Sequence, residues 1–162
     1  MKDRIFSHLS EVDRKGIDNL IKFIEDSNYL TSAQCNSHHK RQHGLMKHSL
    51  EVLDCMLNNN LADIPRESLI LVALCHGLGT ARLSGRKVGA GPHPRRSVCI
   101  LKECGVELTS DERAAILNHH PRGFGKWVSS ALKSPLQLLL QMGDCRSTGL
   151  NKRGKVYRFS AI

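Results

Sequence analysis

Apolar residues recur along this chain every three or four positions, the spacing that places side chains on one face of an α-helix. No segment sustains the strict alternation of apolar and polar residues that is typical of a half-buried β-strand. One apolar stripe near the N-terminus consists of Ile17, Leu20, Ile21 and Ile24. Ser10 is a suitable N-cap and Asp13 a favourable residue for a first turn, so we predict a first helix over residues 10–27.

A second helix is predicted over residues 44–58. Its apolar positions Leu45, Val52 and Met56 lie on one side, and His48 shares that side. His48 is therefore expected to face the core.

A third helix is predicted to begin at Pro65, which suits a first helical position. Its apolar residues lead to His76, which shares a face with Leu69. Gly77 and Gly79 follow, and we expect them to end the helix because glycine adopts positive φ without strain.

Residues 84–92 contain three glycines and are predicted to form a loop. A helix then begins at Pro94 and is expected to stop at Gly105. Thr109 and Glu112 have the spacing of a capping box. They predict another helix, which carries His119 and ends before Pro121.

The last strong helical pattern opens at Ser134 and Pro135 and aligns Leu140 with Asp144. Residues 149–162 are basic and weakly patterned. We therefore predict an all-α fold, a compact bundle of about six or seven helices that forms one domain over residues 1–162.

The chain has 162 residues, a length at which one domain buries most of its apolar surface without disulfides. It holds no run of about 18 apolar residues, and its first residues carry charges where a signal peptide is apolar. We expect a soluble, cytoplasmic protein with no membrane partner. The six cysteines lack CxxC spacing, which argues against a zinc ribbon or a disulfide framework.

Positive charge dominates, with 24 Lys and Arg against 15 Asp and Glu, a formal net charge of +9. One basic group flanks His93 and consists of Arg82, Arg86, Lys87, Arg95 and Arg96. This excess favours anionic partners such as phosphates, although a merely soluble basic surface explains it equally well. Aromatic residues are too few to indicate stacking platforms for single-stranded nucleic acid.

Four helical patterns place a histidine or an aspartate where an apolar residue would continue the stripe: His48, His76, His119 and Asp144. Burying all four without partners costs several kcal/mol, and shared coordination of a metal ion satisfies them together. Imidazole and carboxylate suit first-row divalent metals and leave positions for water and substrate. The alternative is that these side chains make ordinary hydrogen bonds within a helical core.

Four motifs, in this order, resemble those of the HD-domain metal-dependent phosphohydrolase superfamily. They are HGLMKHSLEVLDCM, LILVALCHGLGTARL, GPHPRRSVCILKECGVELTSDERAAILNHH and LLLQMGDCRST. The resemblance covers about residues 30–148. It is to small stand-alone HD proteins of bacterial and phage genomes, and it implies hydrolysis of phosphate esters.

The resemblance implies that His48 and His76 bind the first metal ion and that Asp144 is the late aspartate ligand. His93 and His119 match histidines that serve a second metal or the substrate phosphate. His120 is the alternative to His119 in that role.

The implied cofactor is a divalent ion such as Mn, Fe, Ni, Zn or Mg. His93, His119, Arg95 and Arg96 are the candidate catalytic residues, because they can neutralise charge that develops on a phosphate. His38 matches a histidine that is frequent in these small proteins, and its alternative is an exposed loop position.

The chain departs from the family pattern at two positions. Gly77 stands where the family has the metal-binding aspartate, and Thr80 stands near the family's lysine. A two-metal centre is therefore doubtful, and the metal itself could be absent.

Three interpretations follow for the function. The one we favour is a degenerate HD protein that binds a phosphate-containing small molecule or nucleotide, with weakened or lost catalysis. The second is an active single-metal phosphohydrolase that acts on nucleotides or nucleic acid. The third is a basic module that binds nucleic acid or a protein.

Overall fold

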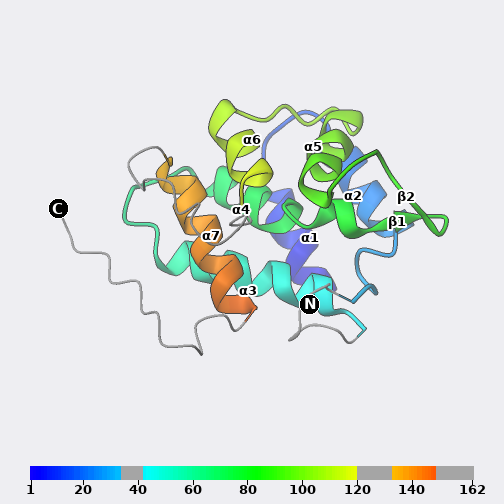
Figure 1. Cartoon of the computed structure of the whole chain (residues 1–162), viewed down its shortest axis with the longest axis horizontal. Coiled ribbons are helices and arrows are strands. Elements are labelled where there is room, and N and C mark those ends of the chain that lie inside the picture. Colours follow the sequence, from blue (N-terminus) through cyan, green and yellow to red (C-terminus); the bar gives the residue numbers. More distant parts are fainter. Residues whose placement is uncertain (34–41, 120–132, 149–162) are drawn as a thin grey trace.

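The computed structural model describes residues 1–33, 42–119 and 133–148. These residues form a mostly helical, compactly packed unit (Figure 1). The helices are α1 (Lys2–Ser10), α2 (Ile17–Asp26), α3 (Gly44–Asn58), α4 (Arg66–Cys75), α5 (His93–Glu103), α6 (Ser110–Leu117) and α7 (Pro135–Ser147). A 3₁₀ turn, η1 (Leu78–Thr80), and a short hairpin of β1 (Arg82–Leu83) and β2 (Arg86–Lys87) complete the described chain. The predicted all-α fold is confirmed.

Helix α4 lies at the centre of the molecule (Figure 1). Every residue from Ser68 to Cys75 is buried, so this helix is apolar on all sides rather than amphipathic. It packs against α1, α3, α6 and α7, and α3 also packs along α7. The C-terminal end of α4 is therefore enclosed by other helices.

The N-terminal region differs from the prediction of one helix over residues 10–27. Ser10 is the last residue of α1 rather than an N-cap, and α2 begins only at Ile17. Helix α1 buries Ile5 and Leu9, a stripe of only two residues. Gly16 precedes α2 with φ 87°, and a Cβ there would come within 2.5 Å of the Cys104 carbonyl oxygen. The chain needs a glycine at this point both for its backbone conformation and for its close packing.

The glycines after α4 also act differently from the prediction. Gly77 has φ −90°, and Gly79 is not among the positive-φ glycines of the described residues. The helix ends by tightening into η1, as many helices do. Gly79 is required for packing, because a Cβ there would lie 2.2 Å from the His93 carbonyl oxygen.

Part of the predicted loop at residues 84–92 is a β-hairpin. β1 and β2 pair antiparallel, with Arg82 opposite Lys87 and Leu83 opposite Arg86. Ser84 and Gly85 both have positive φ, as the two central residues of a tight hairpin turn require. Strands of two residues are too short to produce a visible alternation in the sequence.

Most helix boundaries follow the predicted local signals. Thr109 and Glu112 form the capping box of α6, and Ser134 caps α7 by accepting a hydrogen bond from the Gln137 N–H. Gly105, with φ 83°, follows α5. Pro65 precedes α4 as its N-cap instead of occupying its first turn.

The five cysteines of the described residues are free thiols. No helix in the described part of the chain is long and apolar enough to cross a membrane. His38, His120 and the basic residues 149–162 lie outside the described residues.

Candidate metal centre

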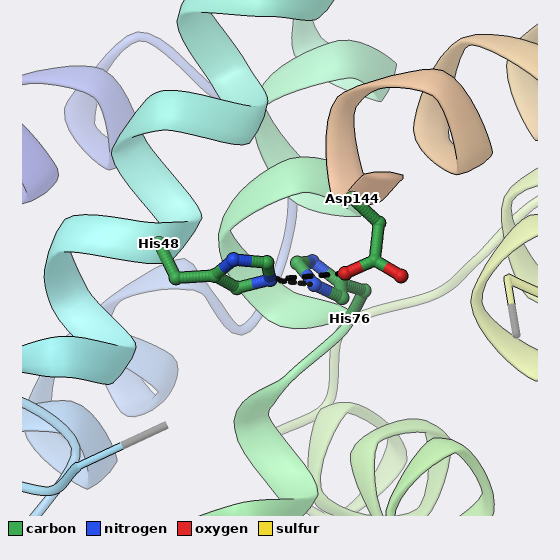
Figure 2. A group of neighbouring side chains, drawn as sticks. All are labelled: His48, His76 and Asp144. Atoms are coloured by element: carbon green, nitrogen blue, oxygen red, sulfur yellow. Dashed lines mark hydrogen bonds and ion pairs between the residues drawn. The ribbon is translucent and has the colours of Figure 1, made fainter. Parts of the chain in front are cut away.

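Three predicted ligands, His48, His76 and Asp144, meet in the interior of the molecule. His48 projects from α3, His76 from the C-terminal end of α4, and Asp144 from α7 (Figure 2). His48 Nε2 lies 3.0 Å from His76 Nε2 and 3.2 Å from Asp144 Oδ1. One ligand atom from each residue lies within 4.8 Å of the other two, and all three residues are buried. We call them the His–His–Asp cluster.

The helices position this cluster because each ligand continues an apolar stripe. Val52 and Met56 on α3 and Leu140 on α7 are fully buried, like the segment of α4 that precedes His76. The packing of α3 against both α4 and α7 then brings the three polar side chains together. The alignment inferred from helical spacing is confirmed for all three residues.

Backbone hydrogen bonds fix the ring orientation of two histidines. His76 Nδ1 lies 2.8 Å from the Ala73 carbonyl oxygen, and His119 Nδ1 lies 2.7 Å from the Ile116 carbonyl oxygen. A carbonyl oxygen only accepts, so both Nδ1 atoms donate their protons. In the neutral ring, the unprotonated Nε2 of His76 is then directed at the cluster.

The donor set of the cluster fits a divalent metal ion. His76 Nε2 and the Asp144 carboxylate both approach His48 Nε2, and in their metal-binding forms all three groups are acceptors. Either a proton on His48 Nε2 or a metal ion can therefore lie between them. Two imidazoles and one carboxylate with free coordination positions suit first-row divalent metals. The hydrogen bond from His76 to a backbone carbonyl is the outer-shell interaction that metal-binding histidines usually make.

His93 and His119 extend the cluster in one direction. His119 lies just beyond the end of α6, and its ring is 4.9 Å from that of His76. His93, the first residue of α5, places its Nε2 3.2 Å from His119 Nε2. Four histidines therefore follow one another in space in the order His48, His76, His119 and His93.

The electrostatics keep His76 and Asp144 in their metal-binding forms near neutral pH. Burial, together with the adjacent imidazole of His48, lowers the pKa of His76 from 6.5 to about 3. Burial raises the pKa of Asp144, but hydrogen bonding with His48 and the nearby imidazoles of His76 and His119 hold it well below its usual value. A neutral imidazole and an ionised carboxylate are the forms that bind metal.

Arg95 and Arg96 are predicted to neutralise charge on a phosphate, but neither side chain pairs with the cluster in the described part of the chain. Arg96 Nε donates to the Gly79 carbonyl oxygen at 2.7 Å, and its guanidinium also donates to the Gly91 carbonyl oxygen. Arg96 thus supports the turn after α4. Arg95 is exposed on the first turn of α5. No hydrogen bond or ion pair joins either arginine to the cluster within the described residues.

Three residues that the sequence did not single out support the site. Ser97 Oγ donates to the His76 carbonyl oxygen at 2.8 Å and accepts from the Gly79 N–H at 2.8 Å. Ser147 Oγ lies 2.9 Å from His48 Nδ1, and Glu51 lies 2.7 Å from the same hydroxyl. Glu51 and Ser147 each follow a ligand by three positions on the same helix, which is the one signal that could have indicated them.

Comparisons with protein-family models, with curated proteins and with solved structures find no match to this chain. The evidence for a function therefore comes from the geometry of the His–His–Asp cluster and of the residues around it.

Proposed function

We propose that this protein is a degenerate relative of the HD-domain phosphohydrolases. In this proposal, His48, His76 and Asp144 bind one divalent metal ion, and a phosphate-bearing ligand occupies the neighbourhood of His93 and His119. Hydrolysis is weakened or lost because Gly77 supplies no carboxylate.

The convergence of three ligand atoms within 4.8 Å carries the proposal. The groups come from α3, α4 and α7, which are far apart in sequence, and all are buried. A bound divalent ion would supply positive charge and an activated water at this position. The low pKa values of His76 and Asp144 support metal binding because few protons compete for these ligands near neutral pH.

The charge of the surrounding chain supports an anionic ligand. From Ser68 to Lys102 the sequence has six lysines and arginines and no aspartate or glutamate. This segment includes both His76 and His93. Local positive charge of this kind attracts phosphates and raises their concentration near a site.

An active single-metal phosphohydrolase is the second candidate. It is favoured by the placement of His119 beside His76 and of His93 beside His119, where imidazoles can neutralise or donate a proton to a phosphate. Phosphoester hydrolysis needs only one activated water and such a group.

Metal analysis combined with a hydrolysis assay tests both candidates. Purified protein incubated with Mn²⁺, Fe²⁺, Ni²⁺ or Zn²⁺ should retain one equivalent, and His48→Ala or Asp144→Ala should abolish retention. His8→Ala is a matched control, since His8 pairs with Glu11 on the surface of α1. Protein that stays metal-free with every ion would overturn both candidates.

The hydrolysis of bis(p-nitrophenyl) phosphate by the metal-loaded protein then separates the two. No turnover above the His48→Ala background, with inorganic phosphate still binding, supports the degenerate protein. Metal-dependent turnover that disappears in Asp144→Ala supports the enzyme.

A further inference from the structure

We propose that Glu51 and Ser147 are positioning residues that keep the proton of neutral His48 on Nδ1, and so leave its Nε2 available to a metal ion. The second half of this inference rests on the proposed metal site. The first half concerns only the side chains of α3 and α7.

The two residues are placed by the same helix packing that forms the cluster. Glu51 follows His48 by three positions on α3, and Ser147 follows Asp144 by three positions on α7. Residues at this spacing lie on one face of a helix. The packing of α3 against α7 therefore brings two pairs together at once, His48 with Asp144 and Glu51 with Ser147.

The direction of the hydrogen bonds follows from the donors available. Ser147 Oγ lies 2.7 Å from Glu51 Oε2 and 2.9 Å from His48 Nδ1. An ionised carboxylate can only accept, so the single hydroxyl proton of Ser147 is donated to Glu51. The serine oxygen then accepts, and His48 Nδ1 must donate to it.

This assignment matters because acceptors on both sides of the His48 ring compete for its one proton. Neutral His48 carries a proton on Nδ1 or on Nε2. Asp144 Oδ1 lies 3.2 Å from Nε2, and His76 Nε2, also an acceptor, lies 3.0 Å from it. Without Ser147, these two acceptors favour the Nε2–H form, in which the ring cannot ligate a metal through that nitrogen. The negative charge of Glu51, transmitted through the serine hydroxyl, favours the opposite form.

Glu51 is itself held in place by a surface cation. Lys47 Nζ lies 3.7 Å from Glu51 Oε1, one helical turn before it on α3. The carboxylate thus has one oxygen toward Lys47 and the other toward Ser147. Such outer-shell interactions fix the orientation of metal-binding histidines in many proteins.

Nuclear magnetic resonance of the metal-free protein tests the first half directly. At mildly alkaline pH, long-range ¹H–¹⁵N spectra distinguish protonated from unprotonated ring nitrogens. Wild-type His48 should show a protonated Nδ1. Ser147→Ala should move the proton to Nε2, and Ser147→Thr, which keeps a hydroxyl, should restore the wild-type pattern. An unprotonated Nδ1 in the wild type, or an unchanged pattern in Ser147→Ala, would overturn the proposal.

Zn²⁺ affinity, measured by competition with a chelator, tests the second half. Ser147→Ala and Glu51→Ala should weaken binding by about 10–100-fold, the usual effect of removing an outer-shell partner. Ser10→Ala is the matched control, because Ser10 also ends a helix and hydrogen-bonds there, in its case to the Ser7 carbonyl oxygen. Equal affinity in all variants would overturn the link between proton position and metal binding.

The two measurements separate this inference from the proposed function. If the wild-type protein binds no Zn²⁺, the proposed metal site fails and the link to metal binding fails with it. The spectra still decide whether Glu51 and Ser147 position the His48 proton. Thermal unfolding of each variant confirms that it is folded before its spectrum is interpreted.

Discussion

Gly77 follows His76 directly and has a backbone conformation that any residue can adopt. Its φ of −90° and ψ of −2° lie outside the left-handed region that favours glycine. A Cβ at this position would approach Leu45 Cδ1 to 2.9 Å, and that atom is the end of a side chain rather than backbone. A small shift of Leu45 therefore admits a side chain, and the turn does not require a glycine at this position.

Gly77→Asp is therefore expected to strengthen metal binding. A carboxylate next to His76 adds negative charge and a further oxygen ligand close to the cluster, which first-row ions accept readily. The measurement is Zn²⁺ or Mn²⁺ affinity, with Gly77→Ala as the control for the displacement of Leu45. Folded Gly77→Asp protein with the affinity of Gly77→Ala would contradict this expectation.

The buried imidazole of His76 predicts how stability depends on pH. The pKa of His76 is lowered from 6.5 to about 3 on folding, so between these values the unfolded chain binds a proton that the folded chain does not. The free energy of unfolding should therefore fall as the pH falls from 6.5 toward 3, by at most about 1.4 kcal/mol per pH unit from this residue.

Denaturant unfolding at a series of pH values measures this effect in the metal-free protein. His76→Asn should show a shallower decline than the wild type over the same window, while His8→Ala should keep the wild-type slope. Parallel curves for wild type and His76→Asn would show that the pKa of His76 is not lowered by folding.

At the scale of the elements, local signals in the sequence are enough to predict most of the bundle. Caps and glycines such as Thr109, Ser134 and Gly105 act within a few residues of themselves, so α3 to α7 lie close to their predicted ranges. The split between α1 and α2 is not predictable in this way, because α1 buries only two residues and its end at Ser10 resembles a helix start.

The same distinction applies to the site. The members of the His–His–Asp cluster are predictable because each interrupts an apolar stripe on its own helix. Ser97 and Ser147 are not, because a serine on a helix is common and its partners here come from other elements. Such roles depend on tertiary packing that no local pattern contains.

One ion pair joins the elements at the N-terminal side of α4. Arg14, between α1 and α2, donates to both carboxylate oxygens of Glu112 at 2.8 Å, and Glu112 is fully buried in α6. Burial alone raises the pKa of Glu112. Hydrogen bonds from Arg14, Ser68 and Thr109 lower the pKa by more than burial raises it, so the net shift is downward. The Arg14–Glu112 ion pair therefore holds the segment between α1 and α2 against α6.

Arg14→Ala should therefore destabilise the protein by about 3–5 kcal/mol, because it leaves a buried carboxylate without its cation. Urea unfolding measures the destabilisation. Asp26→Ala, which removes the exposed pair with Lys22, should cost only about 0.3–0.5 kcal/mol. Similar costs in the two variants would show that the Arg14–Glu112 pair contributes no more than a surface ion pair.

At the scale of the whole molecule, the β1–β2 hairpin lies at one edge (Figure 1). Three of its residues, Arg82, Arg86 and Lys87, are basic. Arg82 and Lys87 face each other across the strands, an arrangement that costs stability without an anion nearby. Among residues 1–33, 42–119 and 133–148, no acidic side chain forms an ion pair with Arg82, Arg86 or Lys87. Asn28 holds the hairpin through hydrogen bonds with both the N–H and the carbonyl oxygen of Arg82.

The protein should bind a duplex oligonucleotide at low salt, and the combined variant Arg82→Gln, Arg86→Gln, Lys87→Gln should bind it more weakly. The slope of log affinity against log salt should become shallower by about 0.9 for each phosphate that the variant no longer neutralises. The control removes three other cations, Lys2, Arg4 and Lys22, which already pair with acids. Equal weakening in both triple variants would mean that only net charge matters.

Anomalous diffraction from crystals grown with Zn²⁺ tests most directly whether His48, His76 and Asp144 hold one divalent ion. We expect one strong anomalous peak per chain, within about 2.0–2.2 Å of His48 Nε2, His76 Nε2 and an Asp144 carboxylate oxygen. A crystal with no peak among these three atoms, in protein whose side chains are otherwise arranged as described, would contradict the proposed metal site.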